Sequence, residues 1–268
     1  MAKVLSGFQR ARPPRRFQRG VYLLPSLFTV ANMFCGWACV VYSMRGEYYI
    51  AAPLIGFAMI LDTVDGRIAR LTGATSDFGE QFDSLADVIS FGVAPATLVF
   101  AWGLEPLGRL GSAAAFLYVT ATAMRLARFN IHGKSGDARY FVGLPSPPAA
   151  GVLVATVFAY PGGFAGPREA LLALVLVLVP AALMVSRIRY RSINTIIPEG
   201  RRPSLSLFVI AGAIAAIAVN PQIVLLLMAY LYLASGLTGL GFSRLRRRHE
   251  PRAAETSAAP PPADEQSA

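Results

Sequence analysis

The sequence contains little cysteine and little histidine, with two of each among 268 residues. Cys35 and Cys39 stand four residues apart in one apolar run, where a disulfide on a helix is improbable. Two thiols alone also make a poor metal site. We therefore interpret both cysteines as packing residues and assign no catalytic role to His132 or His249, so the chemistry of the chain rests on other side chains.

Charged residues are also scarce, at 15% of the chain, whereas 54% of the residues are hydrophobic and the mean hydropathy is +0.50. These values exceed the soluble norm and indicate an all-α polytopic membrane protein. A bilayer-spanning helix needs about 20 residues. Eight apolar runs approach that length, at 21–44, 48–71, 82–104, 107–128, 147–162, 168–187, 204–219 and 221–241. We expect about eight transmembrane helices, of which the fifth and seventh are the shortest.

Basic residues outnumber acidic ones by 25 to 15. If the N-terminus is cytoplasmic, 22 of the 25 basic residues face the cytoplasm, and only Arg45, Arg109 and Arg168 do not. This bias predicts that both termini are cytoplasmic, and it favours anionic membrane lipids over nucleic acid as partners. We expect a basic N-terminus at 1–20, a transmembrane catalytic domain at 21–241, and a tail at 242–268 that is first basic and then disordered.

Four aspartates interrupt this apolar background, namely Asp62, Asp65, Asp83 and Asp87. Acids at membrane depth are costly and mark functional sites. On a helix, Asp62 and Asp65 share an arc of roughly 140° with Gly66, Ala69 and Arg70. Asp83 and Asp87 are four residues apart and also share a face. Two helices can therefore direct two carboxylates each into a common space.

Carboxylates packed together repel one another unless a cation lies between them. Because the set contains only oxygen ligands, it favours magnesium, manganese or calcium over zinc. Gly66 and Gly79 allow a bulky ligand to approach the backbone, and the planar guanidinium of Arg70 suits a diphosphate. These features indicate phosphoryl transfer. A cation or proton transporter is the alternative from another class, but it gives Gly66 and Arg70 no obvious task.

The segment from Asp62 to Asp87 resembles the signature of the CDP-alcohol phosphatidyltransferases at all eight fixed positions. It reads Asp62-x2-Asp65-Gly66-x2-Ala69-Arg70-x8-Gly79-x3-Asp83-x3-Asp87. Three further stretches, at 24–37, 70–96 and 125–151, are similar to the phosphatidylserine synthase branch of that family. The resemblance extends over about residues 21 to 195.

This resemblance implies an enzyme of the bacterial cytoplasmic membrane, with its active site at the cytoplasmic ends of the second and third spans. CDP-diacylglycerol and L-serine would give phosphatidylserine and CMP. The enzyme would bind two ions of Mg²⁺ or Mn²⁺, and their ligands would be Asp62, Asp65, Asp83 and Asp87. The cytidine diphosphate pocket would be lined by Gly66, Ala69, Arg70 and Gly79. The catalytic residues would be Asp83 and Asp87, with Asp87 as general base.

Arg125, Arg128 and Asn130 are the candidates for binding the acceptor alcohol. The two arginines are three residues apart and can point toward one space, where a guanidinium would hold the carboxylate of serine, and Arg128 is the one we expect to do so. Anchoring of the span to lipid headgroups is an equal alternative. Glycerol 3-phosphate or inositol phosphate is the alternative acceptor, because the basic run at 187–191 could bind its phosphate. The sequence is also compatible with a homodimer.

The predicted topology can be tested with single cysteines at Gly20 and Ser243, introduced into a chain without Cys35 and Cys39. Both sites should resist impermeant thiol reagents in intact cells, because the positive-inside bias places both in the cytoplasm. Labelling after permeabilisation serves as the control. Labelling of either site in intact cells would contradict the eight-span arrangement.

Overall fold

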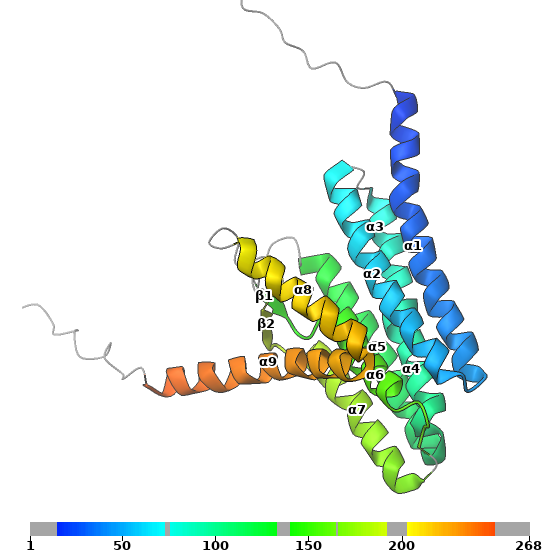
Figure 1. Ribbon diagram of the computed structural model, residues 1–268, viewed down its shortest axis with the longest axis vertical. Helices are drawn as coiled ribbons and strands as arrows, with labels where there is room; N and C mark the ends of the chain where they lie inside the picture. The colour runs from blue at the N-terminus through cyan, green and yellow to red at the C-terminus, as the bar shows by residue number, and fades with distance from the viewer. Residues whose placement is uncertain (1–14, 73–75, 133–139, 165, 192–202, 250–268) are drawn as a thin grey trace, which may run out of the picture.

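The computed structural model describes residues 15–72, 76–132, 140–164, 166–191 and 203–249. Nearly all of these residues are helical (Figure 1). The elements in chain order are α1 (Arg15–Met44), α2 (Tyr48–Thr72), α3 (Asp77–Asp87), η1 (Val88–Val93), α4 (Ala94–Val99), η2 (Phe100–Leu104), η3 (Glu105–Leu107), α5 (Arg109–His132), β1 (Tyr140–Val142), α6 (Ser146–Ala159), α7 (Pro167–Val185), β2 (Arg189–Arg191), α8 (Pro203–Val219) and α9 (Pro221–His249).

Within the described residues, five helices are long and apolar enough to cross a membrane. They are Ser26–Met44, Tyr48–Ile68, Asp77–Leu107, Arg109–Ile131 and Pro167–Val185. These correspond to the first four and the sixth of the expected runs. The apolar helices Ser146–Ala159 and Pro221–Gly236 are shorter, and α8 has 17 residues. The chain is therefore a helical protein with several spans, and the count of eight stays a prediction.

The third span is a single helical stretch that changes its winding along its length. Ser76 caps its start, because the Ser76 hydroxyl accepts a hydrogen bond from the Gly79 amide at 3.0 Å. The π-helical turn η1 directly follows Asp87 and precedes Pro95, which lacks an N–H and cannot complete an α-helical bond. A second π-helical segment, η2, lies nearer the far end. The winding thus changes immediately beside one of the predicted site residues.

The prediction of an all-α fold misses a two-stranded antiparallel sheet. β1 pairs with β2, with Phe141 opposite Tyr190. Tyr190 is fully buried, stacks on Tyr232 at 6.0 Å between ring centroids, and lies against Gly236, where any Cβ would overlap its ring. Burial also raises the pKa of Tyr190 to about 12. Strands of three residues held by contacts with α9 leave little local signal in a sequence.

The helices pack mainly in neighbouring pairs. α1 lies along α2, α5 lies along α7, and α6 lies in the interior against α2 and α9 (Figure 1). α9 crosses the direction of the other long helices.

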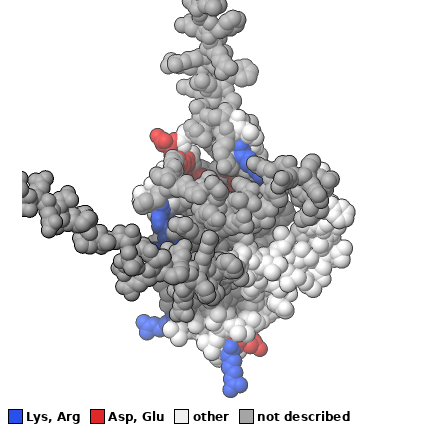
Figure 2. Space-filling view, turned by 90° about the vertical axis from the view of Figure 1, so that its left-hand side faces the viewer, with Lys and Arg blue, Asp and Glu red and all other residues white. Residues whose placement is uncertain are grey.

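Figure 2 shows a broad uncharged surface on the right-hand side of the molecule. Three large apolar side chains are more than half exposed: Phe34 with 62% of its surface, Trp37 with 58% and Phe57 with 59%. Lipid contact explains such exposure, because lipid solvates apolar side chains as well as a protein core does.

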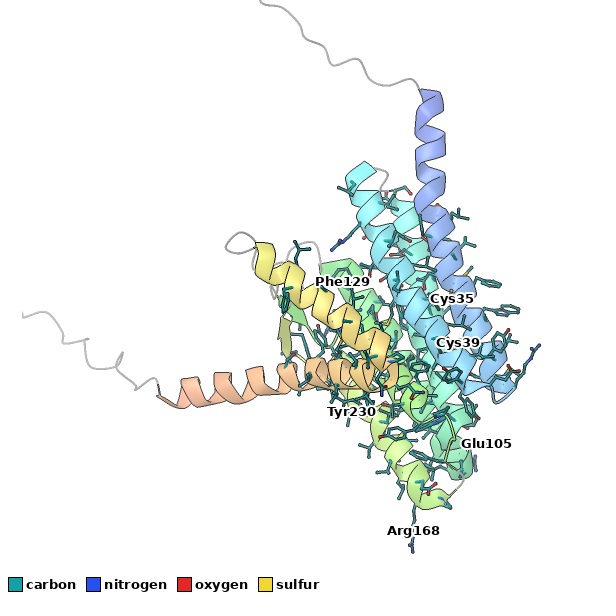
Figure 3. The ribbon with its side chains drawn as sticks, in the orientation of Figure 1. Cys35, Cys39, Glu105, Phe129, Arg168 and Tyr230 are labelled. Atoms are coloured by element: carbon teal, nitrogen blue, oxygen red, sulfur yellow. The ribbon has the colours of Figure 1, made fainter. Side chains whose placement is uncertain are left out.

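One end of the bundle is closed by three hydrogen bonds between connecting segments. The Tyr48 hydroxyl donates to the carbonyl of Ala101 at 2.7 Å, the Trp102 indole donates to the carbonyl of Tyr160 at 2.7 Å, and the Phe164 amide donates to the carbonyl of Trp102 at 2.9 Å. Figure 3 places Glu105 and Arg168 at this end, whereas α3, which carries Asp83 and Asp87, lies toward the other end (Figure 1). Which end faces the cytoplasm stays a prediction.

Candidate metal centre and active site

The structure brings three of the four aspartates together. Asp62, Asp83 and Asp87 each offer one carboxylate oxygen, and these oxygens all lie within 4.8 Å of one another. Asp62 comes from α2, whereas Asp83 and Asp87 come from α3, which returns antiparallel after a short connection. The i, i+4 spacing on α3 stacks its two carboxylates on the face toward α2. Two helices therefore present one group of oxygens, as their spacing predicts.

Asp65 is buried beside this group, with 5% of its surface exposed, but it is not one of the three. Its Oδ2 atom accepts a hydrogen bond of 2.6 Å from the Thr29 hydroxyl of α1. At this length the bond is a strong, charge-assisted one. One oxygen of Asp65 is thus held by α1, a helix that the signature segment does not include.

A second contact joins α1 to the site through Asp87. The Asn32 side-chain amide donates to Oδ1 of Asp87 at 3.4 Å, and the Ser90 hydroxyl donates to the backbone carbonyl of Asn32 at 3.0 Å. Neither Thr29 nor Asn32 is among the site residues that the sequence predicts. The signal that could have found them is their own polarity, since they stand three residues apart in an otherwise apolar span.

The electrostatics of this group call for a cation. Asp62, Asp83 and Asp87 repel one another. Among the described residues, Oδ1 of Asp83 and Oδ1 of Asn32 are buried without a hydrogen-bond partner. Buried oxygens without partners are costly, and a bound ion is one remedy. An all-oxygen donor set of carboxylates fits a hard divalent cation such as Mg²⁺ or Mn²⁺.

The residues predicted to bind the nucleotide lie at the same end. Gly66 follows Asp65 on α2, and Gly79 lies in the first turn of α3, where a Cβ would come within 3.1 Å of the Ser76 hydroxyl. Ala69 and Arg70 belong to α2, but their side chains lie outside the described ones. Their predicted roles in binding the diphosphate therefore stay predictions.

Arg125, on α5, is a basic residue whose charge acts on the aspartates. Its Nη1 atom donates to the Ser146 hydroxyl at 2.7 Å, and its charge interacts with Asp62 and Asp87. Its guanidinium also lies 6.0 Å from the centre of the Phe129 ring. α5 and the start of α6 thereby bring a positive group and a hydroxyl to the side of the carboxylates.

Arg128 is engaged elsewhere. Its Nη2 atom donates to the carbonyls of Val142 at 2.6 Å and Met184 at 3.4 Å, and its Nη1 atom donates to Val185 at 3.4 Å. Met184 and Val185 end α7, where carbonyls lack helical partners and attract cations. Gly143, with φ +86°, lets the chain turn between β1 and α6, and a Cβ there would overlap the Met184 carbonyl and the Arg128 guanidinium.

Asn130 also joins two elements. Its side-chain amide donates to the Ser84 hydroxyl at 2.9 Å, which ties α5 to α3 between Asp83 and Asp87. The three residues predicted to bind the acceptor therefore do different things. Arg125 faces the acids, whereas the described contacts of Arg128 and Asn130 connect parts of the fold. The acceptor roles of all three stay predictions.

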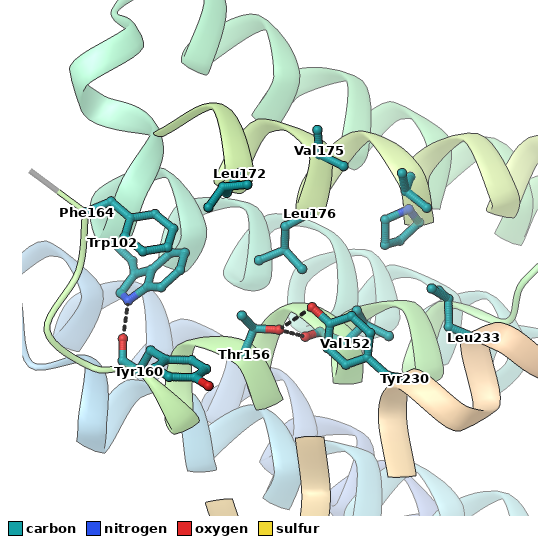
Figure 4. A pocket seen from close by; sticks show the side chains of 12 residues that line it. Trp102, Val152, Thr156, Tyr160, Phe164, Leu172, Val175, Leu176, Tyr230 and Leu233 are labelled. Atoms are coloured by element: carbon teal, nitrogen blue, oxygen red, sulfur yellow. Dashed lines mark hydrogen bonds between the residues drawn. The ribbon is translucent and has the colours of Figure 1, made fainter. Parts of the chain in front are cut away.

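A separate cavity of about 390 Å³ lies between α6, α7 and α9 (Figure 4). Its lining is almost wholly apolar; the Thr156 hydroxyl donates to the Val152 carbonyl at 2.8 Å and lies 3.0 Å from the Tyr230 hydroxyl. It extends to Trp102 and Tyr160, at the end opposite the aspartates. It therefore adds no polar group to the candidate site.

Comparisons with known proteins agree with this geometry. Residues 22–188 match the family model described as CDP-alcohol phosphatidyltransferase. A Helicobacter pylori relative, named CDP-diacylglycerol–serine O-phosphatidyltransferase, is 38% identical over 221 residues, which cover 81% of this chain and 90% of the relative. A Mycobacterium leprae relative of the same name is 31% identical over 229 residues, covering 83% and 76%. An archaetidylserine synthase of Methanothermobacter thermautotrophicus is 34% identical over 173 residues, covering 64% and 70%.

The family match spans more than half of the chain and includes every residue of the acidic group. The match also agrees with the eight signature positions and with the helical, membrane-type architecture. This chain belongs to the CDP-alcohol phosphatidyltransferase family.

Proposed function

We propose that this protein transfers the phosphatidyl group of CDP-diacylglycerol to the hydroxyl of L-serine, and that it requires a divalent metal. The observation that carries the proposal is the convergence of three carboxylate oxygens within 4.8 Å at one end of membrane-type helices. The names of the relatives support serine as acceptor, because both the bacterial names and the archaeal name refer to a serine product or substrate.

The residues that would hold Mg²⁺ or Mn²⁺ are Asp62, Asp83 and Asp87, together with Asp65. A bound ion would neutralise charge on the diphosphate, which is the main catalytic requirement in phosphoryl transfer. We propose two ions, as the resemblance to the family implies for these four aspartates. Gly66 and Gly79 would leave room for the nucleotide, Ala69 would line its pocket, and the guanidinium of Arg70 would bind the diphosphate.

Asp87 is the proposed general base. Its carboxylate would take the proton of the serine hydroxyl while the serine oxygen forms a bond to the phosphorus that carries diacylglycerol. The bond between that phosphorus and the oxygen of CMP breaks, and CMP leaves with the electron pair. Asn32 contacts the Oδ1 atom of Asp87. Asp83, one turn earlier on α3, is the second acid of the proposed catalytic pair.

Arg125 is the proposed holder of the serine carboxylate. Its charge interacts with Asp62 and Asp87, and its guanidinium donates a hydrogen bond to the Ser146 hydroxyl of α6. A guanidinium fork binds a carboxylate through two parallel hydrogen bonds. Arg125 would therefore place the serine hydroxyl near Asp87.

We also propose the cytoplasmic membrane as the location, with CDP-diacylglycerol reaching the site from the surrounding lipid.

Release of CMP tests the reaction. Purified protein given CDP-diacylglycerol, L-serine and Mn²⁺ or Mg²⁺ should release CMP and form phosphatidylserine. EDTA should abolish the release, and either ion should restore it, because the acidic group requires a divalent cation. Full activity in thoroughly chelated protein would exclude metal dependence. Faster CMP release with glycerol 3-phosphate or inositol phosphate than with serine would move the assignment to another acceptor.

The base can be tested by Asp87→Asn, which keeps the shape of the side chain but removes its ability to accept a proton. Turnover should fall by at least about 10²-fold, the usual contribution of a general base. Binding of CDP-diacylglycerol should be largely retained. Asp77→Asn, the same change at an exposed position on the same helix, serves as the matched control. Near-normal turnover in Asp87→Asn would rule out this role.

Arg125→Lys tests the acceptor site, since it keeps the charge and removes the planar fork. The KM for serine should rise by roughly 10- to 150-fold, as expected for a lost hydrogen bond to a charged group, and more than the KM for CDP-diacylglycerol. Arg128→Lys should change both KM values alike, because Arg128 holds backbone carbonyls. The reverse pattern would assign the serine carboxylate to Arg128.

A further inference from the structure

The middle of the first span carries polar residues that share one face of the helix. Thr29, Asn32 and Gly36 follow one another at intervals of three and four residues, so they lie on one side of α1. Thr29 and Asn32 are buried, with 4% and 0% of their surfaces exposed. Neither belongs to the signature segment. Their burial directs the polar face of α1 toward other helices rather than toward lipid.

Gly36 sets how closely α1 approaches the third span. A Cβ at this position would lie 2.7 Å from Oγ and 2.8 Å from Cα of Ser90, closer than such atoms can pack. Because residue 36 has no side chain, the Ser90 hydroxyl reaches the carbonyl of Asn32 at 3.0 Å. Small residues permit this kind of close helix approach in membrane proteins. The register between α1 and the helix that carries Asp87 is thereby defined.

Each polar side chain of this face then meets one aspartate of a different helix. The Thr29 hydroxyl donates to Asp65 of α2 at 2.6 Å, and the Asn32 amide donates to Asp87 of α3 at 3.4 Å. The Thr29 bond is the shorter of the two and holds a single oxygen, Oδ2. A carboxylate with one oxygen held in this way has its other oxygen oriented.

We propose that α1 forms a third wall of the metal centre, in which Thr29 is a positioning residue that orients Asp65, and Asn32 similarly orients Asp87. This inference deepens the proposed function, because it assumes that these aspartates bind a divalent cation. Mutation of residues that orient metal ligands in this way typically lowers metal affinity or activity by about 10- to 100-fold. Thr29 acts through Asp65 and need not touch the substrate.

Thr29→Val tests the proposal, because valine matches threonine in shape but lacks the hydroxyl. Binding of Mn²⁺ to the purified full chain, without substrates, is measured from the electron paramagnetic resonance signal of free Mn²⁺. Thr29→Val should weaken binding by about 10- to 100-fold. Thr29→Ser keeps the hydroxyl and should stay within about 3-fold of the original protein. Thr122→Val is the matched control, since Thr122 is also buried and its hydroxyl has the Tyr118 carbonyl of α5 at 3.0 Å and the Met184 sulfur of α7 at 3.7 Å as partners.

A double-mutant cycle separates positioning from a general effect on the fold. In an Asp65→Asn background, Thr29→Val should weaken Mn²⁺ binding by less than about 3-fold, because its partner is already altered. Equal losses in both backgrounds would overturn the proposal, and so would unchanged binding in Thr29→Val. If Thr29→Val does not fold, Asn32→Leu combined with Asp87→Asn gives a second cycle on the same wall, with the same criterion.

The readout keeps this inference apart from the proposed reaction. Coupling between Thr29 and Asp65 in Mn²⁺ affinity would support the third wall even in a protein that releases no CMP, and in that case only the proposed reaction would fail. CMP release by the original protein, together with additive effects in both cycles, would leave the reaction standing and overturn the wall.

Discussion

The repulsion between clustered, largely buried carboxylates is the constraint on which the rest of this structure depends. Asp62, Asp83 and Asp87 bring their oxygens within 4.8 Å of one another between helices whose other faces are apolar. Negative charges at such distances interact strongly where water is scarce. A positive charge in the same space would relieve this repulsion. Arg125 supplies part of that charge from α5, and a divalent cation would supply the remainder.

The fold holds these charges with groups that come from other helices. α1 contributes Thr29 and Asn32, and α5 and α6 contribute Arg125 and Ser146. These contacts with α1 need a close approach of the helices. Gly36 permits it, because without a side chain the backbone of α1 lies directly against Ser90 of the third span. The change of winding immediately after Asp87 lies at the same level. π-Helical turns inside α-helices are frequently found at functional sites, and this one ends before Pro95.

Much of the site could be predicted from sequence because its spacing is local. The separation of Asp83 and Asp87 by one helical turn, and the length of the runs that became α1, α2, the third span, α5 and α7, depend only on helix geometry. The remaining features depend on contacts between distant segments. Thr29 meets Asp65 across 36 positions, and Arg128 meets Met184 across 56. Spacing along one helix does not reveal which of two neighbouring arginines turns toward the acids and which caps α7. The β1–β2 pair was missed for the same reason.

The central claim is that the carboxylates of α2 and α3 together hold a divalent metal. Its most direct test is an anomalous difference map from crystals of the protein soaked in Mn²⁺, collected at the manganese absorption edge. The account predicts a peak bordered by the carboxylates of Asp62, Asp83 and Asp87, at the oxygen distances of roughly 2.0–2.2 Å expected for a small hard cation. A map with no peak between these residues, or with manganese bound only elsewhere, would contradict it.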